Sequence, residues 1–277
     1  MNYIEVSFKN PKELNDVIIA YAGENGFEMF EESESGLNAY IPEKIFSEAV
    51  LQEMLSSVPD NENISYSFTL IEDRNWNKEW ESNFSPVLID KDVYIRAPFH
   101  EHLDGFKHEI IIEPKMSFGT GHHETTELMI RLMLDLDFKN KTVLDMGCGS
   151  GILAILAYQK GAMQITAVDF DDWAYENCLE NCARNHASSI IVAQGNVSII
   201  KMMNFDIILA NINRNVLLAD SAEYVNSLRA GGLLLQSGFL HEDENLLLGH
   251  AQSLGLNHLK TIRKERWSAM AFTKAIQ

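Results

Sequence analysis

Hydrophobic positions alternate between two patterns over the second half of the chain. Short apolar runs are each followed by a longer segment whose apolar residues recur at helical spacing, as expected for strands that alternate with helices. The expected strands span residues 142–146, 165–169, 190–193, 205–213 and 233–236. This order predicts a doubly wound, mostly parallel, Rossmann-like α/β sheet. Two alternating segments near the end, 258–263 and 267–273, predict an antiparallel hairpin added to that sheet.

The first 71 residues carry a different pattern. Strand-like alternation and helical spacing follow one another in the order β-α-β-β-α-β, which is typical of a ferredoxin-like α+β domain. The first helix is expected to begin at Asn10-Pro11, where a capping residue precedes a first-turn proline. The second is expected to bury a stripe of Phe46, Ala49, Val50 and Met54. No catalytic constellation occurs in this segment, so we expect it to recognise a substrate.

Residues 72–92 are predicted to be a linker between the first domain and a second one that spans 93–277. Trp76 and Trp80 are four residues apart and therefore share one face of a short helix. Two tryptophans could stack on a base, but anchoring the linker against a domain is the simpler interpretation.

The segment that follows the first strand of the second domain predicts a ligand turn. Asp145 stands two residues before Gly147-Cys148-Gly149-Ser150-Gly151, and an apolar helix follows at once. Glycines let the backbone approach a ligand closely, and exposed N–H groups at the helix start bind its polar end. The G-x-G-x-x-G dinucleotide fingerprint would require glycine at Ile152, so a dehydrogenase is the least favoured alternative.

A second acid identifies the kind of ligand. Asp169 ends the next strand about 20 residues on, where a carboxylate can accept hydrogen bonds from ribose hydroxyls. Together with the acid before the glycines, this favours S-adenosylmethionine over NAD. A purely structural αβ turn, with Asp169 capping a helix, is the alternative.

Polar residues also follow the third and fourth strands. Because ligands sit beyond the carboxyl ends of the strands in open α/β sheets, Asp145, Asp169, Asn196 and Asn211 are expected to converge on one crevice. Asn196 falls where a polar group could face adenine. Asn211 could instead be a turn or capping residue.

The loop before the glycine turn is rich in glycine and threonine. Residues 116–126 contain two glycines and three threonines and lead into a helix expected at 127–136, so this loop could close over the same ligand. His122, His123 and Glu124 invite a metal-site interpretation. No second ligand pair at H-E-x-x-H spacing accompanies them, and we predict no metal.

Composition narrows the class of partner. The 277-residue chain has a formal net charge of −18. Residues 1–70 hold three lysines, no arginine and thirteen acids. Such a field repels nucleic acid and attracts basic partners, although solubility alone could explain it. Three cysteines without a C-x-x-C pair, no apolar run of about 18 residues and no secretory opening favour a soluble cytoplasmic protein without a membrane segment.

These motifs resemble, over nearly the whole chain, the methyltransferase family that modifies large-subunit ribosomal protein eleven. The resemblance rests on F-G-T-G-x-H-x-T-T at Phe118–Thr126, D-x-G-C-G-S-G at Asp145–Gly151, the acid Asp169 and A-N-I at Ala210–Ile212. The threonine-rich loop joined to that glycine turn is the specific signal. The sequence departs from the family pattern at three positions: Glu124, Asn213 and Arg214.

The resemblance implies a function and a set of site residues. Methyl groups would pass from S-adenosylmethionine to lysine amines, and to the N-terminal amine, of the basic ribosomal protein, which the first domain would grip. Cofactor contacts would come from Thr126, Gly147 and Asp169, with Gly149 and Asn196 alongside. Asn211 would contact the cofactor and orient the acceptor amine.

Two other functions remain open from the residues alone. The chain could be a methyltransferase that acts on a glutamine amide or on RNA. Such enzymes commonly carry Asn-Pro-Pro-Tyr at the fourth strand end, whereas this chain has Asn211-Ile212-Asn213-Arg214, with no aromatic residue to stack a planar acceptor. It could also be an assembly factor that binds S-adenosylmethionine without turnover.

Overall fold

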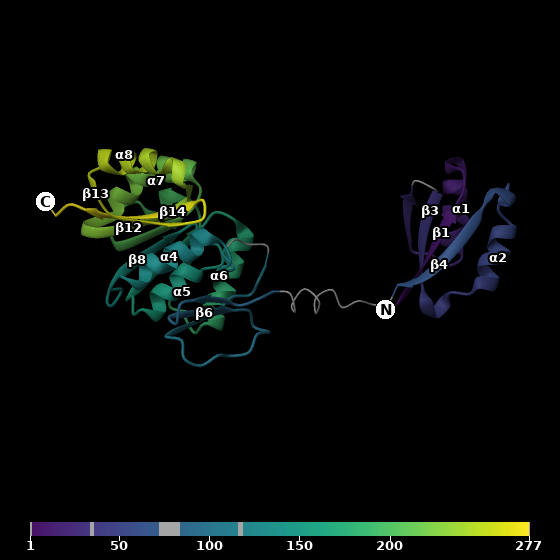
Figure 1. The fold of residues 1–277 in the computed structure, drawn as a ribbon, viewed down its shortest axis with the longest axis horizontal. Coiled ribbons are helices and arrows are strands. Elements are labelled where there is room, and N and C mark those ends of the chain that lie inside the picture. Colours follow the sequence, from purple (N-terminus) through teal and green to yellow (C-terminus); the bar gives the residue numbers. More distant parts are fainter. Residues whose placement is uncertain (1, 34–35, 72–83, 116–118, 277) are drawn as a thin grey trace. The chain divides into compact units, whose positions relative to one another are not determined.

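The chain folds into two compact units, Met1–Asn83 and Phe84–Gln277 (Figure 1). The computed structural model describes residues 2–33, 36–71, 84–115 and 119–276. The linker helix that was predicted around Trp76 and Trp80 lies outside these ranges.

The N-terminal unit is a four-stranded antiparallel sheet with two helices. The strands lie in the order β2-β3-β1-β4. Along the chain the elements are β1 Tyr3–Lys9, α1 Asn15–Glu24, β2 Met29–Ser33, β3 Gly36–Pro42, α2 Glu48–Ser56 and β4 Ser65–Ile71. This is the predicted succession of strands and helices. Inward residues of β1 and β3 form one core with apolar residues of both helices.

Two local predictions in this unit were wrong. The first helix does not begin at Pro11, because residues Lys12–Leu14 form a 3-10 turn and α1 starts at Asn15. Asn10 donates its side-chain N–H to the carbonyl of Pro11 and to Oδ1 of Asn15, so it does not cap α1. In α2, Met54 is buried as predicted, but Val50 is 45% exposed and its neighbour Leu51 lies in the core instead.

The C-terminal unit is built on a seven-stranded sheet in the order β10-β9-β8-β11-β12-β14-β13. Its strands are β8 Thr142–Met146, β9 Gln164–Asp169, β10 Ile191–Gln194, β11 Phe205–Asn211, β12 Leu228–Leu240, β13 Leu256–Lys264 and β14 Trp267–Lys274. Its helices are α4 Glu124–Leu134, α5 Ile152–Gln159, α6 Asp172–Arg184, α7 Arg214–Ser227 and α8 Glu244–Ser253. All neighbouring strands run parallel except around β14, which pairs antiparallel with both β12 and β13. The predicted doubly wound sheet and its terminal hairpin are confirmed.

Helices cover both faces of this sheet (Figure 1). Buried residues of α4, α5 and α6 form one apolar core with inward residues of the strands. A second core joins the opposite sheet face to α7 and α8. Because both faces of the sheet are covered, β8 is buried at all five positions, including Thr142 and Asp145.

A small second sheet precedes the large one. It consists of β5 Val87–Ile89, β6 Val93–Arg96 and β7 His108–Ile111, with β5 antiparallel and β7 parallel to β6. The strand β5 was not predicted. Because it pairs with β6, the second unit begins at Phe84 and overlaps the predicted linker 72–92.

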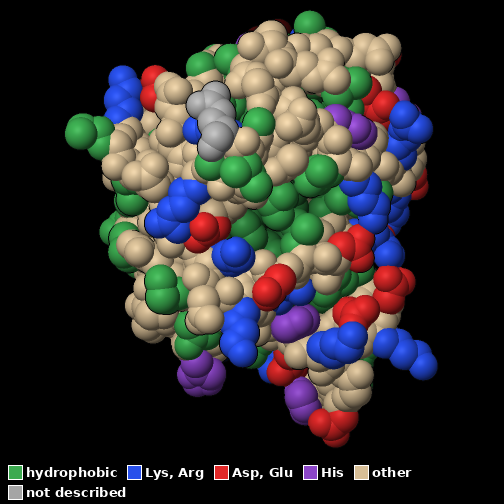
Figure 2. Space-filling view, turned by 90° about the vertical axis from the view of Figure 1, so that its left-hand side faces the viewer, with side chains coloured by type: hydrophobic (Ala, Val, Ile, Leu, Met, Phe, Trp, Pro, Cys, Tyr) green, Lys and Arg blue, Asp and Glu red, His purple; other side chains and the backbone are tan. Residues whose placement is uncertain are grey.

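The edge strand β13 carries basic side chains that form ion pairs with acids of neighbouring segments. Lys260 pairs with Asp135 at 2.6 Å, and Arg263 pairs with Glu244 at 2.5 Å. Figure 2 shows a face of the molecule on which acidic and basic side chains surround an apolar area. Lysine and arginine on an edge strand disfavour pairing with another chain.

One carboxyl group is buried at the end of the central strand β8. The Asp145 side chain is almost wholly enclosed, and its Oδ2 accepts the amide N–H of Ala154 at 3.0 Å. Burial raises the pKa of Asp145 to about 7, because a charged carboxylate loses its hydration there. The nearby negative charge of Asp169 adds to this rise.

We therefore expect the free energy of unfolding to fall as the pH rises towards 8. An unfolded aspartic acid has a pKa of about 3.9, so the folded state holds this proton more tightly. Its contribution is complete below about pH 4 and is lost as the pH rises through about 7. The variant Asp145→Asn keeps an oxygen for Ala154 but cannot ionise. Urea unfolding of both proteins between pH 5 and 8 should show a flatter dependence for the variant; parallel curves would contradict the burial argument.

Candidate functional site

A cavity of about 650 Å³ lies at the carboxyl ends of the central strands of the C-terminal unit. The residues that line it at the ends of β8, β9, β10 and β11 are Met146, Gly147, Gly149, Asp169, Phe170, Gly195, Asn196, Asn211 and Ile212. Three of the four residues that were expected to converge, Asp169, Asn196 and Asn211, thus line one cavity. Asp145 does not line it, since its side chain is enclosed behind the turn.

The glycine turn makes the floor of the cavity. Gly147, Gly149 and Gly151 all have positive φ angles, of 71°, 53° and 80°, which residues with a Cβ rarely adopt. The N–H of Gly149 donates to Oδ2 of Asp169 at 2.9 Å. The turn after β8 and the acid after β9 are therefore held together, although they are separated by a whole helix in the sequence.

Ile212 is enclosed by two glycines. A Cβ on Gly147 would lie 2.2 Å from Cγ2 of Ile212, and a Cβ on Gly238 would lie 2.2 Å from the Ile212 carbonyl oxygen. Gly238 has a φ of 94° and interrupts the register between β12 and β14, as in a β-bulge. Only glycine permits an approach this close. Because Asn211 directly precedes Ile212, the approach also fixes the backbone of Asn211.

Asn211 presents an unsatisfied acceptor. Its Nδ2 donates to Oγ1 of Thr126 at 3.4 Å, which orients the amide. Its Oδ1 is buried and has no hydrogen-bond partner among the described residues. A buried carbonyl oxygen without a partner is costly, so a donor from a ligand or from water would stabilise it.

Asp169 and Asn196 mark one end of the cavity. Asp169 accepts N–H groups from Gly149 and, at 3.1 Å, from Asp171. Asn196 lines the cavity as predicted, while its Oδ1 accepts the N–H of Ser198 at 3.0 Å and so caps a short 3-10 helix. Phe170 also lines the cavity and is 78% exposed, so its ring offers a flat apolar surface beside the acid.

His123, Thr125 and Trp267 also line the cavity. The His123 and Trp267 rings meet edge to face with centroids 4.9 Å apart. Nδ1 of His123 accepts the N–H of Thr125 at 3.2 Å and caps α4. The same Nδ1 lies 2.8 Å from Oγ1 of Thr125.

Thr126 does not line the cavity. It is fully buried behind Asn211, and the neighbouring Thr125 lines the cavity in its place. The helix predicted to begin at Glu127 begins earlier, at Glu124, because His123 provides its cap.

The helix α7 supplies a further wall. Asn213, Val216 and Asp220 line the cavity and recur at helical spacing. Burial raises the pKa of Asp220, and the Tyr224 hydroxyl lies 3.4 Å from its Oδ2. This region therefore combines an apolar surface with a carboxyl group that takes up a proton more readily than usual.

Phe170, Asp220 and Trp267 are among the lining residues that were not found from the sequence. Phe170 could have been found, since it directly follows the strand-end acid. Asp220 and Trp267 carry no local motif, because a helix and a distant hairpin bring them to the cavity. Within the described residues, no three His, Cys, Asp or Glu side chains are grouped so that they could hold a metal ion. His122 instead contacts the carbonyl of Ser85 at 2.8 Å through Nε2.

Comparison with known proteins identifies the family. Residues 5–275 match the family model described as ribosomal protein L11 methyltransferase (PrmA). A ribosomal protein L11 methyltransferase of Phocaeicola vulgatus is 44% identical over 98% of this chain and 99% of its own length. One from Porphyromonas gingivalis is 43% identical over 99% of this chain and 98% of its own length.

A solved structure agrees with the sequence comparisons. The ribosomal protein L11 methylase of Lactobacillus delbrueckii subsp. bulgaricus superposes with a TM-score of 0.65 at 26% identity, over 69% of this chain and all of the other. In the part of the chain that the structure describes, no helix has the length and apolar character needed to cross a membrane. The family model covers almost the whole sequence and the relatives match end to end, so this chain belongs to the ribosomal protein L11 methyltransferase (PrmA) family.

Proposed function

We propose that this crevice binds S-adenosylmethionine and that the enzyme methylates amines of ribosomal protein L11, namely lysine side chains and the N-terminal amine. The observation that carries the proposal is the buried Oδ1 of Asn211, which has no partner in the described part of the chain and lies in a cavity shared with a glycine turn and a strand-end acid. The names of the relatives supply the identity of the substrate. Because the proposed substrate is a ribosomal protein, we expect the enzyme to act in the cytoplasm.

The residues present fit an adenosyl cofactor. The Asp169 carboxylate would accept hydrogen bonds from ribose hydroxyls, and the Phe170 ring and Asn196 would face the adenine. The positive-φ glycines at 147 and 149 would let the backbone approach the amino-acid end. Thr126 would act indirectly, because its hydroxyl oxygen accepts a hydrogen bond from the Asn211 amide and holds that amide in place. When bound, S-adenosylmethionine supplies an electrophilic methyl group on a sulfonium.

The chain must make the acceptor amine reactive. A lysine ammonium has a reference pKa of about 10.4 and has to lose a proton before its lone pair can attack. Apolar walls from Met146, Ile212 and Trp267 would desolvate the ammonium and lower that pKa. Asn211 Oδ1 would accept one of the two N–H groups that the neutral amine keeps and would aim its lone pair. Catalysis would then depend mainly on proximity and orientation.

Methyl transfer can be measured with labelled S-adenosylmethionine and purified L11, followed by mass analysis of the product. The wild-type enzyme should transfer labelled methyl groups to amines of L11. Asn211→Ala should lower kcat about 100-fold, since misdirected reactants typically lose that much. The exposed control Asn257→Ala should match the wild type.

Two results would contradict the proposal. Label on RNA, on a glutamine amide or on nothing would remove the proposed substrate. Unchanged kcat in Asn211→Ala would remove this residue from the site. Thermal unfolding of each variant separates these outcomes from loss of the fold.

We also propose that the N-terminal unit is a ferredoxin-like domain that holds the basic substrate on the open face of its sheet. Its strand order and its two helices on one face support that fold. Along β1, Ile4, Val6 and Phe8 are buried, while Tyr3 and Glu5 are on the face that no described helix covers.

Two acids of this open face, Glu5 and Glu31, form no ion pair with a basic side chain among the described residues. The Tyr40 hydroxyl donates to Glu31 at 3.2 Å. Partial burial together with the negative charges of Glu5 and Glu31 raises the pKa of Tyr40 to about 12. A cationic segment of the substrate would meet these carboxylates.

Charge reversal on the open face should weaken substrate binding. In Glu5→Lys/Glu31→Lys, KM for L11 should rise about 10-fold while kcat is retained, because charge complementarity governs encounter and register. The control Glu24→Lys/Glu53→Lys makes the same change in net charge on the exposed surfaces of α1 and α2. Equal effects of both pairs on KM would show that only total charge matters.

A further inference from the structure

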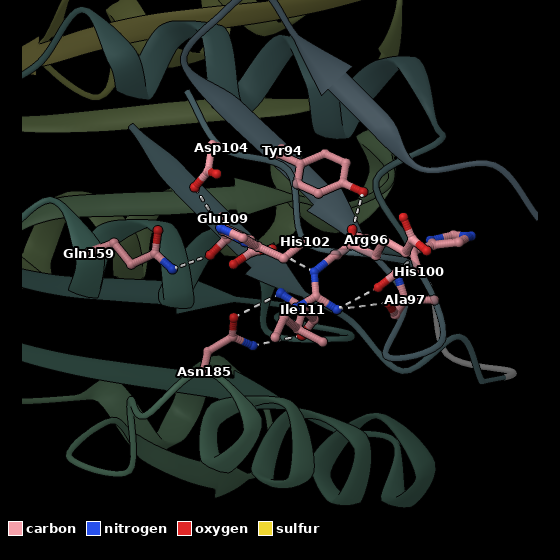
Figure 3. Close-up of polar contacts among 11 residues, drawn as sticks. Tyr94, Arg96, Ala97, His100, His102, Asp104, Glu109, Ile111, Gln159 and Asn185 are labelled. Atoms are coloured by element: carbon pink, nitrogen blue, oxygen red, sulfur yellow. Dashed lines mark hydrogen bonds and ion pairs between the residues drawn. The ribbon is translucent and has the colours of Figure 1, made fainter. Parts of the chain in front are cut away.

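Helix α6 uses side-chain amides to hold the segment that precedes the threonine-rich loop. Asn185 accepts the N–H of Ile111 at 2.8 Å and donates to the Ile111 carbonyl at 2.6 Å, as a neighbouring strand would (Figure 3). One turn earlier, Asn181 accepts the N–H of Glu113 at 2.9 Å. These bonds satisfy the backbone of β7 and of the residues after it.

Asn181 makes an additional bond that Asn185 does not make. Its Nδ2 donates to the carbonyl of Ser150, at 2.9 Å, and to Oδ1 of Asn177, at 3.0 Å. Ser150 belongs to the glycine turn. Asn181 is fully buried, so its amide is fixed by three partners that come from the turn, from α6 and from the chain after β7.

Ser150 extends the same connection to the loop. Its hydroxyl donates to the carbonyl of Gly119 at 2.6 Å, and the side chain is fully buried. The contact is close enough that a Cβ on Gly119 would lie 2.7 Å from Ser150 Oγ. Gly119 also has a φ of 104°, so both the contact and the backbone conformation require glycine here.

We infer that Asn181 and Ser150 are positioning residues that clamp residues 119–126 to the glycine turn, so that both sides of the cofactor cavity are assembled together. Neither side chain lines the cavity. Asn181 acts through the turn, and Ser150 acts through the loop that carries His123 and Thr125 into the cavity wall. The inference rests on the proposed function in one respect, namely that the cavity takes an adenosyl cofactor.

The clamp makes cofactor affinity depend on two hydrogen bonds outside the cavity. Without the Ser150 hydroxyl, the loop loses its tie to the turn, and some binding energy must be used to hold the loop in place. Without the Asn181 amide, the turn carbonyl and the Glu113 N–H lose their partner together. Both bonds are needed to connect the loop to the glycine turn. Loss of either bond should therefore remove most of the gain in cofactor affinity that the clamp provides.

The test measures the dissociation constant for S-adenosylhomocysteine by calorimetry on the full chain. Ser150→Ala and Asn181→Ala should each raise the dissociation constant about 5- to 10-fold, and the double variant should raise it by far less than the product. The matched control is Asn185→Ala, which removes the same kind of bond to β7 but none to the turn. It should lower the melting temperature and leave the dissociation constant within about twofold.

Every result of these measurements either supports or overturns the proposed clamp. Additive effects of Ser150→Ala and Asn181→Ala, an unchanged dissociation constant in both, or an equal rise in Asn185→Ala would overturn the clamp. If Asn181→Ala fails to fold, Ser150→Ala alone remains decisive, since it removes only one oxygen atom. A wild-type protein that does not bind S-adenosylhomocysteine would instead contradict the proposed cofactor.

Discussion

The close approach of Ile212 to the backbone at Gly147 and Gly238 is the constraint on which the site depends. It brings the end of β11 against the turn after β8 and against the bulge in β12, at distances that no side chain would allow. Asn211 therefore points its amide between Thr126 and the cavity, and no described residue pairs with its oxygen. A buried acceptor of this kind is costly, and the proposed amine substrate would supply a donor to it.

Acidic side chains lie both at the cavity and on the surface of the N-terminal unit. Asp145 and Asp169 lie close together beneath and beside the turn, and burial favours the protonated form of Asp145. Asp169 receives two backbone N–H groups at the cavity, from Gly149 and from Asp171. The acidic N-terminal unit has its carboxylates on exposed surfaces. A cationic cofactor and a cationic protein substrate are both suited to these fields.

The sequence predicted the large sheet and much of the cavity because both depend on local patterns. Apolar strands such as β8 and the glycine turn are encoded by neighbouring residues, and the rule for strand ends brings Asp169, Asn196 and Asn211 together. Asp220 and Trp267 reach the cavity through packing of α7 and β14, which no short window records. The late start of α1 likewise reflects competing hydrogen bonds of Asn10 that propensity does not include. His123 as the cap of α4 was missed because histidine is an unusual capping residue.

The most direct measurement is a crystal structure of the protein with S-adenosylhomocysteine bound. We expect the nucleoside in the cavity of about 650 Å³, with ribose hydroxyls within hydrogen-bond distance of the Asp169 carboxylate and the adenine beside Phe170. The sulfur should lie on the side of the cavity formed by Asn211. A ligand bound elsewhere, or one that leaves Asp169 without a ribose contact, would contradict the account.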